Sequence, residues 1–162
     1  NHETSPQSKF FIRAIEAAAS DFKVRVDQAA VRSMTEIEST IEKTAKEPGG
    51  GLIVPTDSYT RVRGDRIAEL ALIHRLPALG AFAEFVDKGG LMFYGPSAAD
   101  SLVEQFRYAA GYVDRILKGT KPGDLPIQST NKFALQINRK TAAALGLDIP
   151  PKLLFTADRV IE

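Results

Sequence analysis

Asp57, Ser58 and Tyr59 are the neighbouring residues whose types are best suited to holding a small ligand. They follow the short apolar run Leu52–Val54, which is typical of a buried strand. In an open α/β sheet, ligands lie beyond the carboxyl ends of the strands. At that position the Asp57 carboxylate is suited to pairing with an ammonium group, and the Tyr59 ring to stacking on a flat ligand. Ordinary turn residues have the same composition, so a purely structural role for these residues stays open.

A second candidate lies at the beginning of the chain, where Thr4 and Ser5 precede Pro6. A serine followed by a proline is typical of a helix start, and the free backbone N–H groups of a first helical turn favour a carboxylate or another anion. The alternative is that Ser5 only caps the helix, and the two roles are compatible.

Three aromatic residues are candidates for the wall of an apolar pocket. Phe82 and Phe85 flank Glu84 in a segment that follows a predicted strand, and Phe85 is equally suited to filling the core. Tyr94 ends another predicted strand, where its hydroxyl needs a polar partner.

The sequence lacks the patterns that support catalysis, metal binding or phosphate binding. It has no cysteine, no glycine-flanked nucleophilic serine and no H-E-x-x-H helix. His74 has only His2 as a histidine companion, with no metal-ligand spacing around it. Gly49–Gly51 precedes a strand, whereas a phosphate-binding loop follows one. We therefore expect no enzyme, no metal and no cofactor, although carboxylates that are distant in the sequence can still meet in the fold.

Composition and charge narrow the class further. The chain has 162 residues, of which 44% are apolar and 25% are charged. This length and apolar content are enough to bury one ordinary core. A net charge of +1 with interspersed signs gives no reason to expect nucleic acid or an anionic membrane as a partner. No apolar run has the length of a membrane span, and the first ten residues do not resemble a signal peptide. Any export signal is expected outside this chain.

The periodicity of apolar residues alternates between helix and strand along the chain. It predicts helices from Ser5 to about Ser20 or Asp21 and over residues 34–46, 66–75 and 98–118. It predicts strands at Lys23–Asp27, Leu52–Val54, Pro77–Gly80 and Leu91–Tyr94. The run Leu52–Val54 is expected to be buried on both faces, with an exit loop from Pro55 to Ser58. This order predicts an α/β fold with a doubly wound, mostly parallel sheet flanked by helices.

The end of the chain repeats the scheme on a smaller scale. Phe133, Leu135 and Ile137 alternate as in a strand, and Asn138 then caps an alanine-rich helix that Gly146 ends. Pro150 and Pro151 precede a last short apolar element.

The residue order in these segments resembles the sequence motifs of one family, the extracytoplasmic solute-binding proteins of ABC transporters of the tryptophan and tyrosine type. The final segment is similar to the family's "N-K-T-A-x-x-L-G-L" helix and "I-P-P" turn. Further resemblance lies in the "G-G-L-x-x-Y-G", "A-A-x-Y-V-D-x-I-L-x-G", "H-R-L-P-A" and "E-F-V" segments. The residues that carry it are Asn138, Lys140 to Ala142, Leu145 to Leu147, Ile149 to Pro151, Gly90 to Pro96, Tyr108 to Gly119, His74 to Ala78 and Glu84 to Val86.

The resemblance implies the second lobe of a type I periplasmic-binding-protein-like fold plus elements of the first lobe. Residues 1–85 would form a second-lobe domain without its first strand. Residues 86–126 would be a crossover and a long helix of the first lobe, and residues 127–162 would close the fold. It also implies a periplasmic or extracytoplasmic protein that captures a small solute and engages a membrane permease. A ligand-binding sensory domain of a signalling protein is the alternative, because the same fold serves receptors.

The resemblance further suggests an amino acid with an aromatic or apolar side chain as the solute. Its carboxylate is expected near the first helix and its ammonium near Asp57, with closure about segments 82–95 and 127–134. If the first lobe is absent, the long helix carries an uncovered apolar stripe, which predicts a homodimer or an exchanged oligomer. The alternative is that the chain is a truncated piece. The stripe comprises Leu102, Phe106, Val113 and Ile116.

Overall fold

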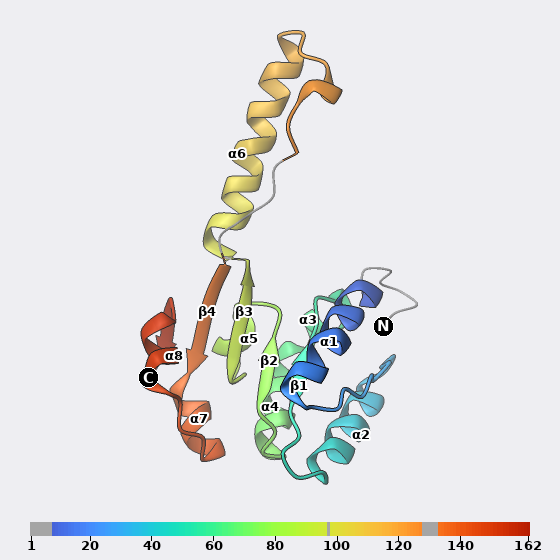
Figure 1. Ribbon diagram of the computed structural model, residues 1–162, viewed down its shortest axis with the longest axis vertical. Coiled ribbons are helices and arrows are strands. Elements are labelled where there is room, and N and C mark those ends of the chain that lie inside the picture. Colours follow the sequence, from blue (N-terminus) through green and yellow to red (C-terminus); the bar gives the residue numbers. More distant parts are fainter. Residues whose placement is uncertain (1–7, 97, 128–132) are drawn as a thin grey trace.

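The chain folds as one five-stranded sheet flanked by helices, with a long helix that extends from it (Figure 1). The computed structural model describes residues 8–96, 98–127 and 133–162. For residues 8–9 and 98–105 it describes the backbone alone. The helices are α1 (Ser8–Phe22), α2 (Met34–Ala45), α3 (Ser58–Val62), α4 (Gly64–Ile73), α5 (Glu84–Asp87), α6 (Ala98–Leu117), η1 (Pro122–Asp124), α7 (Arg139–Leu145) and α8 (Pro151–Thr156). The strands are β1 (Leu52–Val54), β2 (Ala78–Gly80), β3 (Met92–Pro96), β4 (Phe133–Asn138) and β5 (Arg159–Ile161).

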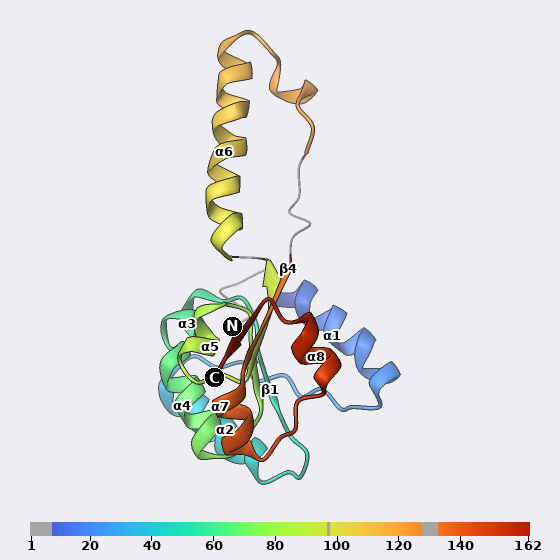
Figure 2. The same cartoon turned by 90° about the vertical axis from the view of Figure 1, so that its left-hand side faces the viewer.

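The strand order is β1-β2-β3-β4-β5. β1, β2 and β3 are mutually parallel, β4 runs antiparallel to β3, and β5 is parallel to β4. Figure 2 shows α4, α5 and α7 on one face of the sheet and α1 and α8 on the other. The expected fold class, a mostly parallel α/β sheet with helices on both faces, is confirmed.

Local signals account for several helix ends. The Ser33 hydroxyl accepts a hydrogen bond from the Glu36 amide at the start of α2. The helix begins at the predicted residue and ends at Ala45, one residue before the predicted end. Asn138 caps α7 as expected, because its Oδ1 accepts from the Thr141 amide. Gly146 ends α7 with φ of 72°, a left-handed conformation that favours glycine.

The main core lies between the sheet and the helices α2 and α4. It is aliphatic, apart from the ring of Phe85, which α5 contributes. That ring lies so close to Gly80 and Gly90 that a Cβ built on either would come within 2.5 Å and 2.1 Å of its Cδ1 atom, respectively. The backbone at the end of β2 and before β3 therefore needs glycine at both positions. The core residues are Ile37, Ile41, Val54, Ile67, Ala68, Leu70, Ala71, Leu76, Ala78 and Phe85.

Two expectations about the first strands are wrong. Residues 23–27 form no strand, and Val24 is exposed, because a strand needs a neighbour for its backbone hydrogen bonds and this segment pairs with none of the described strands. β1 is present, but it lies at the edge of the sheet. Ile53 is 56% exposed, so β1 is not buried on both faces.

Three short elements were not expected from the pattern. These elements are α3, α5 and β5. The predicted exit loop after β1 runs into α3, which begins at Ser58. α5 and β5 are too short to show a periodicity in the sequence. α4 covers Gly64–Ile73 rather than 66–75, and α1 ends at Phe22 rather than at Ser20 or Asp21. The predicted start of the first helix at Ser5 lies outside the described residues.

α6 extends away from the sheet beyond the carboxyl end of β3 (Figures 1 and 2). The returning segment through η1 runs beside it, and the Tyr112 hydroxyl donates to the Pro126 carbonyl. Phe106 is 71% exposed, and Val113 and Ile116 are also exposed, so the expected stripe is uncovered. The side chain of Leu102 lies outside the described part.

Candidate ligand-binding site

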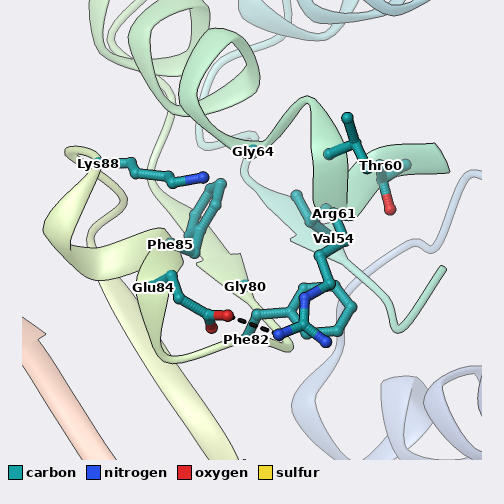
Figure 3. Close-up of a pocket in the computed structure, with 10 residues that line it drawn as sticks. Val54, Thr60, Arg61, Gly64, Gly80, Phe82, Glu84, Phe85 and Lys88 are labelled. Carbon is teal, nitrogen blue, oxygen red and sulfur yellow. Dashed lines mark hydrogen bonds and ion pairs between the residues drawn. The ribbon is translucent and has the colours of Figure 1, made fainter. Parts of the chain in front are cut away.

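A pocket of about 230 Å³ lies where β1 and β2 end. Val54, the last residue of β1, and Gly80, the last of β2, form its floor together with the ring of Phe85 (Figure 3). This is the carboxyl edge of the parallel strands, where an open α/β sheet binds its ligands. The remaining lining comes from α3, the start of α4 and the segment around α5: Thr60, Arg61, Val62, Gly64, Phe82, Glu84 and Lys88.

Asp57 builds one wall by starting α3. Its Oδ1 accepts hydrogen bonds from the backbone N–H groups of Tyr59, at 2.8 Å, and Thr60, at 3.2 Å. These bonds make Asp57 the N-cap of a helix that the sequence pattern did not indicate. Asp57 is only 6% exposed, whereas Ser58 beside it is exposed. The Asp57 carboxylate thus has a structural role in addition to any role toward a ligand.

Arg61 lines the pocket from α3, and its side chain extends to Glu84 and the ring of Phe82 (Figure 3). Its Nη2 donates to Glu84 Oε1 at 2.6 Å, and its guanidinium carbon lies 4.6 Å from the centre of the Phe82 ring. The pKa of Glu84 is below its ordinary value, chiefly because its own backbone N–H bonds to the carboxylate and also because Arg61 does. The side chains of Arg61 and Glu84 are each about half exposed, so solvent and solutes can reach this ion pair.

Lys88 is the second cation of the lining, on the other side of Phe85 in Figure 3. Its ammonium forms an ion pair with Asp65, at the start of α4. This hydrogen bond is the main reason that the pKa of Asp65 is below its ordinary value. The pocket therefore has a cation at each end and an apolar floor between them.

Two of the aromatic candidates do not line this pocket. Tyr59 packs against the main core and carries the guanidinium of Arg63 3.6 Å above its ring. Tyr94 is 59% exposed and stacks on Phe133 of β4, with ring centres 5.8 Å apart. The Tyr59 ring thus already has protein neighbours, while Tyr94 lies on β3 nearer to α6.

The two remaining aromatic candidates do line the pocket, in different ways. Phe82 is half-buried beneath Arg61, and Phe85 is a core residue at 4% exposure whose ring also reaches the pocket. Of the six expected site residues that the structure describes, Phe82 and Phe85 line the pocket, and Asp57 and Ser58 begin the helix that forms its wall. Thr4 and Ser5 lie outside the described residues.

Arg61, Glu84 and Lys88 are the charged residues of the pocket that sequence reasoning did not assign to the site. Arg61 lies four residues after Asp57, one helical turn beyond the cap, but no periodicity in the sequence indicates α3. Among the described residues, no three His, Asp or Glu side chains are grouped so as to hold a metal ion. None of the helices in those same ranges is long and apolar enough to span a membrane.

Comparison with solved structures defines the class of this fold. An ABC domain in complex with L-Trp from Streptococcus pneumoniae is 26% identical, with a TM-score of 0.82, and the match covers 98% of this chain and 52% of that one. A conserved domain protein from Vibrio cholerae O1 biovar El Tor is 21% identical, with a TM-score of 0.79, covering 94% and 50%. A ligand-free, open substrate-binding protein with adhesive properties from Clostridium difficile is 21% identical, with a TM-score of 0.68, covering 97% and 51%. The fold is therefore that of the periplasmic-binding-like domains.

The residue pattern of the family described as "ABC transporter substrate binding protein" matches residues 3–161. The chain belongs to this family. It spans about half the length of the solved structures that it matches. No match was found among curated proteins.

Proposed function

We propose that the chain is the second-lobe part of a protein that captures a small solute for an ABC uptake transporter. The observation that carries this proposal is the pocket at the carboxyl ends of β1 and β2, in a chain that belongs to the substrate-binding family. The pocket lies at the carboxyl edge of the parallel strands, and α6 departs from the same edge beyond β3 (Figure 1). An adjoining lobe on that side would enclose a solute between two surfaces.

The division of the chain follows the same proposal. Residues 1–85 form the second-lobe domain without its first strand, residues 86–126 the crossover and the first-lobe helix, and residues 127–162 the closing segment. Ile53 on the edge strand β1 and the apolar face of α6 are both exposed. This exposure supports the proposal that a further strand lies beside β1 and that a first lobe packs on α6 in the two-lobe protein. Closure would bend the chain at segments 82–95 and 127–134, of which residues 128–132 lie outside the described part.

The proposed solute is an amino acid with an aromatic or apolar side chain. The apolar floor, with the side chains of Val54 and Phe85, and the Phe82 ring beside it suit such a side chain. The L-Trp in the complex from Streptococcus pneumoniae supports the same class. Asp57 is proposed to receive the ammonium group, and Thr4 and Ser5 to lie near the carboxylate. Ser58, Tyr59 and Tyr94 are proposed as further ligand contacts that form only when the two lobes close, because Tyr59 and Tyr94 do not line the pocket.

The proposed partners and location follow from the family. Its members are generally not enzymes and generally work outside the cytoplasm, where they deliver solutes to a permease. We place this protein in the periplasm or another extracytoplasmic space, without catalysis or a cofactor. By itself the 162-residue chain would pair with a second copy through α6. A sensory receptor domain remains the second candidate function, because the fold is shared.

A thermal-shift screen of the complete gene product against amino acids, peptides and sugars tests the function. A solute that binds only the folded protein must raise its melting temperature. We expect a shift with L-tryptophan, L-tyrosine or a branched amino acid. If no member of these classes gives a shift, solute capture as proposed is wrong.

A further inference from the structure

Arg61 is the cation of the pocket best placed to change its partner. We infer that Arg61 leaves Glu84 and binds the carboxylate of an incoming aromatic or apolar amino acid, so that Glu84 is its competitor in the empty protein. The inference rests on the proposed function, because it needs a solute at this edge of the sheet. It adds a ligand-contacting residue and a chemical requirement, which is a free carboxylate on the solute. It also assigns to Arg61 the carboxylate contact that the proposed function gives to Thr4 and Ser5.

The contacts of Arg61 leave room for this exchange. A guanidinium has five N–H donors in a planar fork that matches a carboxylate in a bidentate arrangement. Among the described residues, the Arg61 side chain makes one hydrogen bond, to Glu84 Oε1 at 2.6 Å. A ligand carboxylate that takes two of these donors therefore gains more hydrogen bonds than the exchange loses.

The surroundings favour the ligand over Glu84. An ion pair between two half-exposed side chains contributes little, because water screens both charges. The same guanidinium bound to a solute carboxylate in a closed cleft is shielded from water, where charge-assisted bonds are stronger. Breaking the pair with Glu84 thus costs less than the ligand contact supplies.

Phe82 connects this contact with recognition of the side chain. The guanidinium lies 4.6 Å from the centre of the Phe82 ring, and both residues line the same pocket (Figure 3). The ring holds the guanidinium plane in position through a cation–π contact. A carboxylate on Arg61 would therefore bring the rest of an amino acid close to the apolar floor beside Phe82.

Arg66 provides a matched control, because it is also a half-exposed arginine that pairs with carboxylates, those of Glu38 and Glu69, but it does not line the pocket. It lies on α4, whereas Arg61 lies on α3. If the inference is correct, replacing Arg66 leaves binding of the carboxylate unchanged, whereas replacing Arg61 does not.

The test is calorimetric titration of the complete gene product with L-tryptophan and with L-tryptophanamide, which lacks the carboxylate. Arg61→Gln is expected to raise the Kd for L-tryptophan by about tenfold to a hundredfold, the range for a charge-assisted bond. It should leave the Kd for the amide unchanged, and Arg66→Gln should leave both Kd values unchanged. Glu84→Gln should bind L-tryptophan at least as tightly as the unmodified protein, because the competitor is weaker.

The outcomes separate the inference from the function on which it rests. Unchanged L-tryptophan binding in Arg61→Gln would overturn the inference alone, and so would an equal loss for the acid and the amide. Weaker binding in Glu84→Gln would also overturn it, and this variant gives a reading even if Arg61→Gln folds poorly. An unmodified protein that binds no solute in the thermal-shift screen would overturn the proposed function and the inference together.

Discussion

At the scale of single residues, Asp57 combines a structural role that is visible with a binding role that is proposed. Its carboxylate accepts two backbone N–H bonds at the start of α3 and is almost fully buried. The pattern of the sequence placed Asp57 after a strand at the correct edge of the sheet. It could not indicate the cap, because the five residues of α3 are too few to show a helical period.

Substitutions at Asp57 separate the two roles. Asp57→Asn retains an oxygen that caps α3 but removes the charge, so the free energy of unfolding should change little while solute binding weakens by about tenfold or more. Asp57→Ala should lose about 1 kcal/mol of stability as well, as expected for a lost cap. Chemical denaturation and calorimetric titration of both variants measure these effects.

Two results would contradict this account of Asp57. Unchanged solute binding in Asp57→Asn would show that its charge does not contact the ammonium group. Unchanged stability in Asp57→Ala would show that the two N–H bonds contribute nothing to folding.

At the scale of elements, α7 is held to α5 through the residue that caps it. Asn138 Oδ1 accepts from the Thr141 amide, and Asn138 Nδ2 donates to the buried Val86 carbonyl, each at 3.0 Å. The Thr141 hydroxyl donates to the Gly89 carbonyl, also at 3.0 Å. These bonds connect the closing segment to the region proposed as a hinge.

Asn138→Ala should therefore cost more than the loss of an ordinary cap. It removes the cap of α7 and leaves the Val86 carbonyl without its side-chain donor, for a total of about 2–3 kcal/mol in unfolding free energy. Ser33→Ala is the matched control, because Ser33 caps α2 through one bond and should cost about 1 kcal/mol. Equal costs in urea denaturation would show that the bond to Val86 adds nothing.

The elements that the sequence predicted are those with local causes. The cap at Asn138 and the left-handed Gly146 depend on neighbours a few residues away, and both are confirmed. The expected strand at residues 23–27 depends on a partner strand, which alternation alone cannot supply. Arg61 was missed for a related reason, because its partner Glu84 is 23 residues away in the sequence.

At the scale of the whole molecule, the uncovered face of α6 is the main feature that the described chain leaves unexplained. Phe106 and Val113 are seven residues apart, two helical turns, and both are exposed on the same face. An apolar face of this kind is normally covered by protein. We propose that the first lobe covers it in the two-lobe protein and that a second copy covers it in the 162-residue chain alone.

Sedimentation of the 162-residue chain tests this proposal. We expect concentration-dependent dimers, and we expect Phe106→Glu to shift the chain to monomers because a buried charge opposes the contact. Arg115→Glu is the control, since position 115 is two residues after Val113 and therefore on the opposite side of the helix. A chain that stays monomeric at every concentration would contradict pairing through α6.

The central claim is that the carboxyl edge of β1 and β2 is one half of a solute site. A crystal structure of the complete gene product with the amino acid found by the thermal-shift screen tests it most directly. We predict a solute beside Phe82 with its carboxylate on Arg61, enclosed on the opposite side by the other lobe. A solute bound elsewhere, with the pocket between α3 and α5 empty and the Arg61–Glu84 pair intact, would contradict the account.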